Sequence, residues 1–359
     1  MRKENLYLYS KRFSLSLNRE LGSLPGKRSR DVVILRLDIG NQSFYSEASP
    51  LSGFSNEKIE DLSPQIELLN KVVRSQQTWD LTKEEDQEKL FSSIKSPSLK
   101  FALESILLEH LATDTSIREQ SAGIQINAQY LLNCNALISA PLTTQIKNDL
   151  TLKISQGFKR IKIKVLPDNF QAIASILNEY KEKLEQNSCM IRLDPNRSLN
   201  LNQTFDLIEK TRELPIEYIE EPTLELSHLP NLISRSPTPI ALDETARELS
   251  INSWITWSGL KHVVVKPTLL GGPFTIARLN TFLKDKGINL TITSSLESDI
   301  GLRSIALLCA YIEFDGFAGL DTADIFIDRT GLPLFPSECP QISLSRIKEI
   351  TLNTTRYAV

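Results

Sequence analysis

The feature that most constrains the fold is a repeated pattern of about 23 to 30 residues, in which a short apolar run ends at polar residues. This interval accommodates one strand, one helix and the two loops of a β/α unit. In a barrel of such units the carboxyl ends of the strands meet on one face. The polar residues at these ends are Lys162, Lys164, Asp194, Glu220, Asp243, Lys266, Ser294 and Ser295. We therefore expect them to converge on one site.

The apolar runs number about eight, which is the number of strands that closes a TIM-type barrel. They cover residues 135–138, 161–165, 190–194, 216–220, 240–243, 263–266, 290–294 and 316–319. Between them lie stretches with apolar residues at helical spacing, such as Ile173, Ile176 and Leu177. The pattern predicts an α/β fold with a TIM-type (β/α) barrel.

The N-terminal part of the chain has a different pattern. Residues 6–17, 31–40 and 43–47 read as strands joined by turns, which predicts an antiparallel meander. Residues 56–110 carry helical periodicity. Strands followed by helices indicate a separate α+β domain.

Composition restricts the class of partner. The chain has 359 residues and a formal net charge of −3, so it lacks the basic surface that nucleic-acid binding demands. A polar start and the lack of a run of about 18 apolar residues argue against a signal peptide and a membrane span. Cys134, Cys189, Cys309 and Cys339 are far apart and fit free thiols in a reducing cytosol. We expect a cytoplasmic monomer or homo-oligomer that binds a small molecule.

Three carboxylates end consecutive strands of the predicted barrel: Asp194, Glu220 and Asp243. Converging hard oxygens suit Mg²⁺, which takes an octahedral shell at ~2.1 Å. Any one of these acids alone also fits the amino end of a helix, where the helix dipole favours negative charge. All three in sequence, beside Lys164 and Lys266, favour a metal site.

The lysines suggest a base beside that metal. Strand alternation puts Lys162 and Lys164 on one face, and likewise Arg192 and Asp194. Lysines inside a barrel favour a site in which cations lower each other's pKa, and a lysine tuned in this way can accept a proton. Alternatively, 162–164 is an exposed strand with solvated charges.

Two loop motifs carry weaker signals. Ser294 and Ser295 lie at a strand end entering a helix, so their hydroxyls and amides could hold a substrate carboxylate or cap the helix. Gly271 and Gly272 have no phosphate-binding sequence around them, and we expect a structural role for this pair.

Five motifs resemble the muconate-lactonising branch of the enolase superfamily, in its order and spacing: 162–164, 194–196, 220–222, 243–244 and 265–267. Three further segments resemble the o-succinylbenzoate synthase family within that branch: 47–55, 294–301 and 319–322. Ser46 and Ser52 depart from that family's usual glycine and proline. The departures touch neither the metal ligands nor the lysines, and they concern the substrate lid.

The resemblance implies a syn dehydration of 2-succinyl-6-hydroxy-2,4-cyclohexadiene-1-carboxylate to o-succinylbenzoate, a step of menaquinone or phylloquinone synthesis. It implies Mg²⁺, or Mn²⁺ in its place, on Asp194, Glu220 and Asp243, an enediolate formed when Lys164 removes a proton, and Lys266 stabilising that anion. The expected substrate contacts are Lys162, Arg192, Asn196, Ser294, Ser295, Gly319 and Leu320.

The resemblance also implies three segments. They are an α+β capping domain over 1–125, the barrel over 126–326, and a C-terminal segment over 327–359 that returns to the cap. Cap loops near 14–23 and 47–55 would cover the site and exclude water.

Two other functions fit the same sequence. Two opposed lysines could also move a proton between the faces of one carbon, as in a racemase of N-succinyl amino acids or a dipeptide epimerase. Asp321 and Asp324 are one residue too far apart for the Asp-x-Asp contact that would favour an epimerase. A non-catalytic barrel module is the other alternative, and it would be marked by a missing ligand or lysine.

Overall fold

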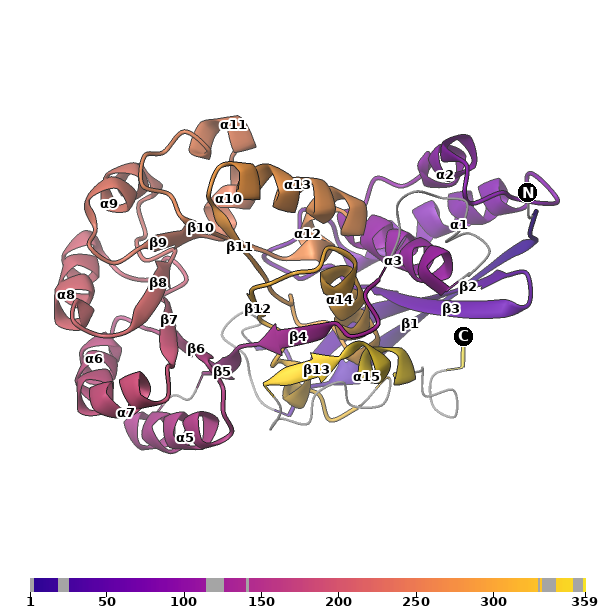
Figure 1. Ribbon diagram of the computed structural model, residues 1–359. Helices are drawn as coiled ribbons and strands as arrows, with labels where there is room; N and C mark the ends of the chain where they lie inside the picture. Colours follow the sequence, from indigo (N-terminus) through magenta and orange to yellow (C-terminus); the bar gives the residue numbers. More distant parts are fainter. Residues whose placement is uncertain are drawn as a thin grey trace.

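The computed structural model describes residues 3–18, 26–113, 126–139, 142–328, 330, 340–350 and 358–359. Figure 1 shows two bodies side by side: an N-terminal sheet with helices, in indigo and purple, and a curled sheet surrounded by helices. The expected α+β cap and β/α barrel are therefore both present.

The cap is built on a three-stranded antiparallel sheet in the order β1-β2-β3. Its strands are β1 (Leu6–Ser16), β2 (Ser29–Ile39) and β3 (Gln42–Ala48). Its helices are η1 (Ile59–Asp61), α1 (Leu62–Val73), α2 (Glu84–Phe91) and α3 (Pro97–Thr113). Nearly every side chain of α3 is buried, because this helix lies between the cap sheet and the barrel.

The barrel wall is a seven-stranded parallel sheet in the order β11-β10-β9-β8-β7-β6-β5. Its strands are β5 (Ala136–Ile138), β6 (Arg160–Lys164), β7 (Met190–Asp194), β8 (Ile216–Glu220), β9 (Ile240–Leu242), β10 (His262–Val265) and β11 (Asn289–Ile292). Each expected strand from 135–138 to 290–294 is present, with its ends shifted by at most two residues.

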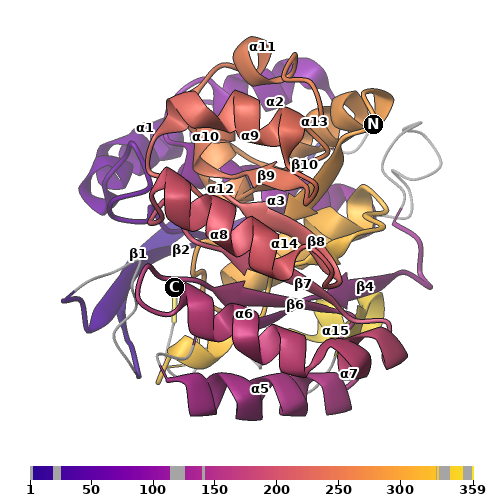
Figure 2. The ribbon, with the colours of Figure 1, turned by 90° about the vertical axis from the view of Figure 1, so that its left-hand side faces the viewer.

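Helices cover the outer face of this sheet, as Figure 2 shows for α5, α6, α8 and α9. The helices from α5 to α9 are α5 (Thr143–Ser155), α6 (Phe170–Glu179), α7 (Lys181–Gln186), α8 (Leu201–Thr211), η2 (Leu226–His228) and α9 (Leu229–Arg235). The later ones are α10 (Glu244–Glu248), α11 (Ile251–Trp254), α12 (Pro267–Leu270), α13 (Pro273–Asp285) and α14 (Asp299–Tyr311).

The eighth strand is much shorter than the sequence suggested. β12 (Phe317–Ala318) pairs in parallel with β4 (Leu131–Cys134), which directly precedes β5. On its other side the Gly319 amide donates to Ile292 O at 2.8 Å, and Gly319 O accepts from the Ser294 amide at 2.9 Å. β12 thus closes the gap between β11 and the start of the barrel.

This closure involves two residues that were expected to contact a substrate, Gly319 and Leu320, and those contacts stay a prediction. Both backbone groups of Gly319 are used for strand pairing, and a Cβ there would collide with the Thr293 hydroxyl. The Leu320 side chain is fully buried in the barrel's hydrophobic core. Gly319 and Leu320 therefore hold the barrel shut, because a buried strand end must pair its amides before it can serve a ligand.

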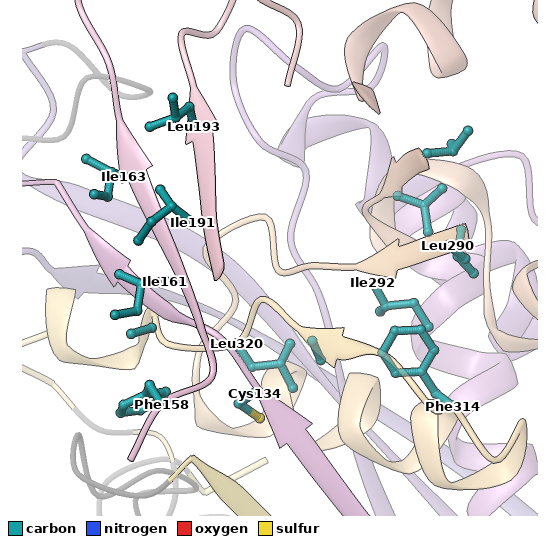
Figure 3. Packing of buried hydrophobic residues seen from close by; sticks show 14 of the residues in the cluster. Cys134, Phe158, Ile161, Ile163, Ile191, Leu193, Leu290, Ile292, Phe314 and Leu320 are labelled. Atoms are coloured by element: carbon teal, nitrogen blue, oxygen red, sulfur yellow. The ribbon is translucent and has the colours of Figure 1, made fainter. Parts of the chain in front are cut away.

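The core of the barrel lies between the sheet and its helices. Figure 3 shows Ile161 and Ile163 along β6 beside Ile191 and Leu193 of β7. They alternate with Lys162 and Lys164, so the apolar side chains face the helices and the lysines face the barrel interior. Within the described residues Cys134, Cys189 and Cys309 are buried, and Cys339 lies outside the described residues.

The chain from residue 325 onward touches both domains. The Ile327 amide donates to Ser16 O of the cap at 2.9 Å, and Arg36 donates to Val359 O. The short helix η3 (Ala323–Ile325) precedes the first of these contacts, and β13 (Gln341–Ser343), which pairs with β4, and α15 (Leu344–Glu349) lie between the two. The C-terminal segment is thus shared between cap and barrel, and the boundaries at 125 and 326 stay a prediction.

No helix among the described residues is long and apolar enough to span a membrane.

The Gly271–Gly272 pair has the structural role expected of it. Gly271 ends α12 at φ +102°, and Gly272 precedes α13 at φ +109°. A Cβ on Gly272 would lie 2.5 Å from Oε2 of Glu104, the cap carboxylate that accepts from the Phe274 amide at 3.0 Å. The pair therefore makes a close contact between cap and barrel possible.

We expect Gly272→Ala to lower the free energy of unfolding by roughly 2–3 kcal/mol, because it adds backbone strain and displaces a buried carboxylate. Gly287→Ala is the matched control, since Gly287 also has positive φ but a Cβ there has nothing within 4 Å. Urea unfolding of both variants measures the difference, and equal losses would contradict the role given to Glu104.

His262 makes the stability of the barrel sensitive to acid. Burial lowers the pKa of His262 to about 4, and its ring packs on Tyr218 with the centroids 5.1 Å apart. The unfolded chain binds this proton near pH 6.5 and the folded chain only near pH 4, so stability is complete above pH 6.5 and falls between these values. We expect His262→Phe to remove about 2 kcal/mol of the loss in unfolding free energy between pH 7 and pH 5. Equal pH dependence of the two proteins in urea titrations would refute this.

Candidate active site

The carboxyl ends of the barrel strands bring the predicted charged residues together. Lys164 and Asp194 are the last residues of β6 and β7 and lie opposite each other in the parallel register. Glu220 ends β8, while Asp243 and Lys266 directly follow β9 and β10. Because parallel strands all end on the same side of the sheet, these side chains share one mouth.

A lysine and two carboxylates form the centre of the cluster. Nζ of Lys162 lies 2.7 Å from Asp194 Oδ2 and 2.7 Å from Glu220 Oε2. Nζ of Lys164 lies 2.6 Å from the same Asp194 oxygen and also donates to Oδ1 of Asn196. Lys162, Lys164, Asp194, Glu220 and Asn196 are thus in direct contact, as the sequence predicted.

The opposite side of the mouth carries a second pair. Nζ of Lys266 binds Oδ2 of Asp243, and both side chains are largely buried. Lys266 follows β10 and Lys164 ends β6, four places apart in the order of the curled sheet. The two expected catalytic lysines therefore approach the site from different walls of the barrel.

The carboxylates raise the pKa of two of the lysines, Lys162 and Lys266. Burial alone lowers the pKa of Lys162, but Asp194 and Glu220 outweigh it and raise this pKa well above its ordinary value. Burial likewise lowers the pKa of Lys266, and Asp243 and Glu220 outweigh it so that the pKa is raised. Lys162 does lower the pKa of Lys266, as expected, but the buried carboxylates outweigh this effect, so the net direction is upward for both lysines.

The carboxylates themselves are electrostatically coupled. Burial raises the pKa of Glu220, and the negative charges of Asp194 and Asp243 raise it further. Burial would also raise the pKa of Asp194, but Lys162 and Lys164 hold it below its usual range. Three acids in one buried site are therefore close enough to repel one another and require positive charge among them.

A second group of polar residues surrounds the three acids that were predicted to bind the metal and holds them in place. The sequence analysis did not predict this group. Glu221 is fully buried, and its oxygens accept from the amides of Asp243 and Thr245 at 2.9 and 2.8 Å. Arg197 reaches across to Glu221 at 3.0 Å and to Glu248 at 2.8 Å. The signal available in the sequence was the pair Glu220–Glu221 at the end of β8. Glu220 faces the mouth, and Glu221 holds the segment after β9 that carries Asp243 and Thr245.

The donor set fits a hard divalent cation. Asp194, Glu220 and Asp243 offer only carboxylate oxygens, the ligands that Mg²⁺ takes in proteins. Glu244, next to Asp243, is also buried, and its Oε2 has no hydrogen-bond partner among the described residues. Within the described ranges no three acidic, histidine or cysteine side chains already surround one point, because the lysine ammonium groups lie between the carboxylates.

Arg192 is placed differently from its prediction as a substrate contact. Its guanidinium is 2% exposed and binds Glu217 Oε2 at 2.6 Å, Asn135 Oδ1 at 2.7 Å and Phe317 O at 2.9 Å. These partners come from β8, from the segment between β4 and β5, and from β12. Arg192 therefore ties the barrel's first and last strands to its middle, one layer below Asp194.

The Ser294–Ser295 loop is also engaged internally. The Ser294 hydroxyl bonds that of Thr322 at 2.8 Å, and the Ser295 amide donates to Glu297 Oε2 at 2.7 Å. The Ser294 amide pairs with Gly319 O, so neither amide is free for a substrate carboxylate. The loop shapes the mouth through its backbone, because buried amides and hydroxyls must first be paired.

The two predicted cap loops border this region. Residues 47–55 are described, and Leu51 O accepts the Ser55 amide at 2.7 Å in a tight turn. Of the other loop, 14–18 is described, with the Asn18 amide bound to Ile325 O at 2.9 Å. Residues 19–23 of the predicted lid lie outside the described residues. Closure over the site stays a prediction.

Comparison with known sequences supports this reading of the barrel. The sequence family described as Enolase C-terminal domain-like matches residues 147–323. Curated o-succinylbenzoate synthases from Desulfotalea psychrophila and Aliivibrio salmonicida are 23% and 27% identical to this chain over 347 and 330 residues. These alignments cover 89% and 90% of this chain and 94% and 92% of the two relatives.

Solved structures with the same fold cover both domains. Muconate lactonizing enzyme from Pseudomonas putida superposes with a TM-score of 0.76 at 17% identity, over 98% of this chain and 97% of that one. The L-Ala-D/L-Glu epimerase from Bacillus subtilis has a TM-score of 0.76 at 18% identity, over 94% and 95% of the two chains. At such identities the likeness extends to the fold alone. The family match over most of the barrel, the relatives along most of the chain and the shared two-domain fold together support membership of this chain in the enolase superfamily.

Proposed function

We propose that this protein is a Mg²⁺-dependent o-succinylbenzoate synthase, which dehydrates 2-succinyl-6-hydroxy-2,4-cyclohexadiene-1-carboxylate. The observation that carries the proposal is the pair Lys164 and Lys266, on different walls of the mouth and each on a buried carboxylate. The curated relatives that bear the synthase name align with about nine-tenths of the chain and support the choice of substrate.

Lys164 is assigned as the base because it is the accessible lysine. Its side chain is 36% exposed, against 12% for Lys162, which is enclosed by two carboxylates. Asn196 has its backbone in the left-handed region, at φ +47°, and its Oδ1 accepts a hydrogen bond from Lys164. Asn196 and Asp194 thus aim the Lys164 amine at the mouth, where a substrate proton can be reached.

The elimination needs one residue to carry out two proton transfers in turn, first accepting a proton from the substrate and then returning one to the leaving hydroxyl. The neutral amine of Lys164 takes the proton from the ring carbon that bears the carboxylate, and the electron pair of that C–H bond is left on the substrate. The carbon–oxygen bond to the hydroxyl then breaks with its own pair, and the Lys164 ammonium protonates the leaving group, so that water departs. The pair left by the proton completes the aromatic ring.

Lys266 is suited to stabilise the negative charge that develops on the substrate when Lys164 removes the proton. Because Asp243 raises its pKa against the effect of burial, Lys266 stays an ammonium ion at neutral pH. A fixed positive charge on the wall facing the base stabilises negative charge that develops on the substrate. Mg²⁺, held by Asp194, Glu220 and Asp243, would supply the charge that binds the substrate carboxylate and acidifies the neighbouring carbon.

A Mg²⁺-dependent ultraviolet assay with the cyclohexadiene carboxylate tests the proposal. We expect rapid formation of o-succinylbenzoate that stops on addition of a chelator and returns with excess Mg²⁺. No conversion by folded, Mg²⁺-loaded protein would refute the synthase function.

The same two lysines favour one second candidate, proton exchange on a single carbon. A racemase of N-succinyl amino acids or a dipeptide epimerase needs a base on one face and an acid on the other. Polarimetry with N-succinyl amino acids, run beside the ultraviolet assay, distinguishes the two. Racemisation without dehydration would assign the protein to this class instead.

A further inference from the structure

A buried ionic network lies where the cap meets the barrel, apart from the acids and lysines of the mouth. Its charged members are Arg30 on β2, Glu47 on β3 and Glu297 in the loop after β11. Arg30 is 4% exposed, and both glutamates are fully buried. Charged side chains are rarely buried to this degree unless they are paired and hydrogen-bonded.

Arg30 binds the backbone of two different loops. On the cap side its guanidinium donates to Ser49 O at 2.6 Å and to Pro50 O. On the barrel side it donates to Leu296 O at 3.4 Å and to Ser295 O at 3.5 Å. One side chain thus links the cap loop 47–55 to the barrel loop 294–298, which follows β11 at the mouth.

The barrel loop 294–298 is connected in turn to the part of the barrel that carries Lys266. Glu297 accepts from the Ser295 amide at 2.7 Å and from the Thr268 hydroxyl at 2.7 Å. Thr268 is fully buried and stands two residues after Lys266. A continuous set of hydrogen bonds therefore leads from Arg30, through the loop, to the segment that carries Lys266.

The barrel loop is held in a conformation that it would not adopt alone. Leu296 has φ +65°, in the left-handed region that disfavours branched side chains. Such strain persists only where surrounding contacts enforce it. Glu47 supplies a second anchor, because it accepts from the Ser298 amide at 3.1 Å, and Thr330 donates to the Ser298 hydroxyl at 2.6 Å.

We propose that Arg30 is a positioning residue of the active site, which fixes the cap loop 47–55 against the barrel loop 294–298 and so sets the substrate-binding surface at the mouth. The proposal concerns how the substrate is held and rests on the proposed function. Arg30 itself touches no reacting atom. It acts through the two loop backbones and, by way of Glu297 and Thr268, on the wall that carries Lys266.

An arginine is needed here because of its geometry. The planar guanidinium presents five donors in a rigid fork and reaches carbonyls on both loops. A lysine keeps the positive charge that compensates Glu47 and Glu297, but its compact ammonium cannot span the same set of carbonyls. Arg30→Lys therefore separates the loss of positioning from the loss of buried charge.

The test compares Arg30→Lys with Arg303→Lys as a matched control. Arg303 is also a buried arginine at the junction of cap and barrel, and its side-chain hydrogen bonds within the described part of the chain go to Glu109 of α3 and to neither loop. We expect Arg30→Lys to raise KM for the cyclohexadiene carboxylate about tenfold or more while the Mg²⁺ requirement is unchanged. Arg303→Lys should lower stability without changing KM. A further variant, Arg30→Ala, should also have a raised KM. Free guanidinium ion added to the assay should then lower that KM towards the parental value.

Hydrogen exchange measured by mass spectrometry gives a readout that does not depend on the substrate. Peptides covering 47–55 and 294–298 should exchange faster in Arg30→Lys than in the parent protein, and at the parent rate in Arg303→Lys. Unchanged KM and unchanged exchange in Arg30→Lys would overturn the proposal, as would equal effects in both variants. If the parent protein does not dehydrate the substrate, the proposed function fails, and the exchange rates still decide whether Arg30 joins the loops.

Discussion

Replacing Lys164 by alanine or by arginine is expected to lower kcat by about 10³-fold to 10⁴-fold, because either change removes the only accessible amine beside Asp194 among the described residues. Arginine keeps a positive charge near that carboxylate, yet a guanidinium does not deprotonate in proteins. The two variants therefore separate proton transfer from charge pairing. Single-turnover kinetics with the cyclohexadiene carboxylate measure the effect.

The fold and the metal site should survive these substitutions. Lys164 is partly exposed, and Lys162 still compensates Asp194 and Glu220 in its absence. Lys210→Ala, on the exposed face of α8, is the control and should have parental activity. Dehydration at a parental rate by Lys164→Arg would refute the assignment of the base.

Asp243→Asn is expected to raise the Mg²⁺ concentration for half-maximal activity by about 100-fold or more, since residues that only support metal ligands already contribute 10–100-fold. An amide keeps the size of the carboxylate but loses its charge. The change also removes the partner that raises the pKa of Lys266. Direct titration of Mg²⁺ by calorimetry separates lost binding from lost turnover.

Asp206→Asn on α8 is the matched control, because Asp206 is exposed and its ion partner is Lys210 on the same helix. It should bind Mg²⁺ as the parent protein does. If Asp243→Asn also binds Mg²⁺ with parental affinity, Asp243 is not a ligand and the proposed set of three fails.

The sequence was sufficient to predict most of the barrel, because local chemistry decides it. Strands such as 190–194 and 216–220 are short apolar runs flanked by helical patterns, and each unit buries its own apolar face. The antiparallel cap sheet was predictable for the same reason, from alternation and turn residues. The convergence of Lys164, Asp194 and Glu220 then followed from strand polarity alone.

The features that the sequence could not predict depend on contacts between segments far apart in the chain. Arg192 looked like a site residue because it shares a face with Asp194, but Asn135 and Phe317 reach it from the other end of the barrel. The pKa values of Lys162 and Lys266 rise because of carboxylates on neighbouring strands. The spacing of residues in the sequence does not reveal whether a carboxylate or another lysine lies nearer to each of these two lysines in the folded protein.

The sequence by itself therefore determined the two-domain architecture and the identity of the charged residues at the mouth, because hydrophobic period and strand polarity are local properties. Only the tertiary structure decided which polar groups are already paired. It showed that Ser294 and Gly319 pair with each other in the barrel closure, while their contact with a substrate stays a prediction, and it revealed Arg30 between two loops about 240 residues apart in sequence. Such pairing depends on distance and burial in the folded chain, and these exist only once the barrel has closed against the cap.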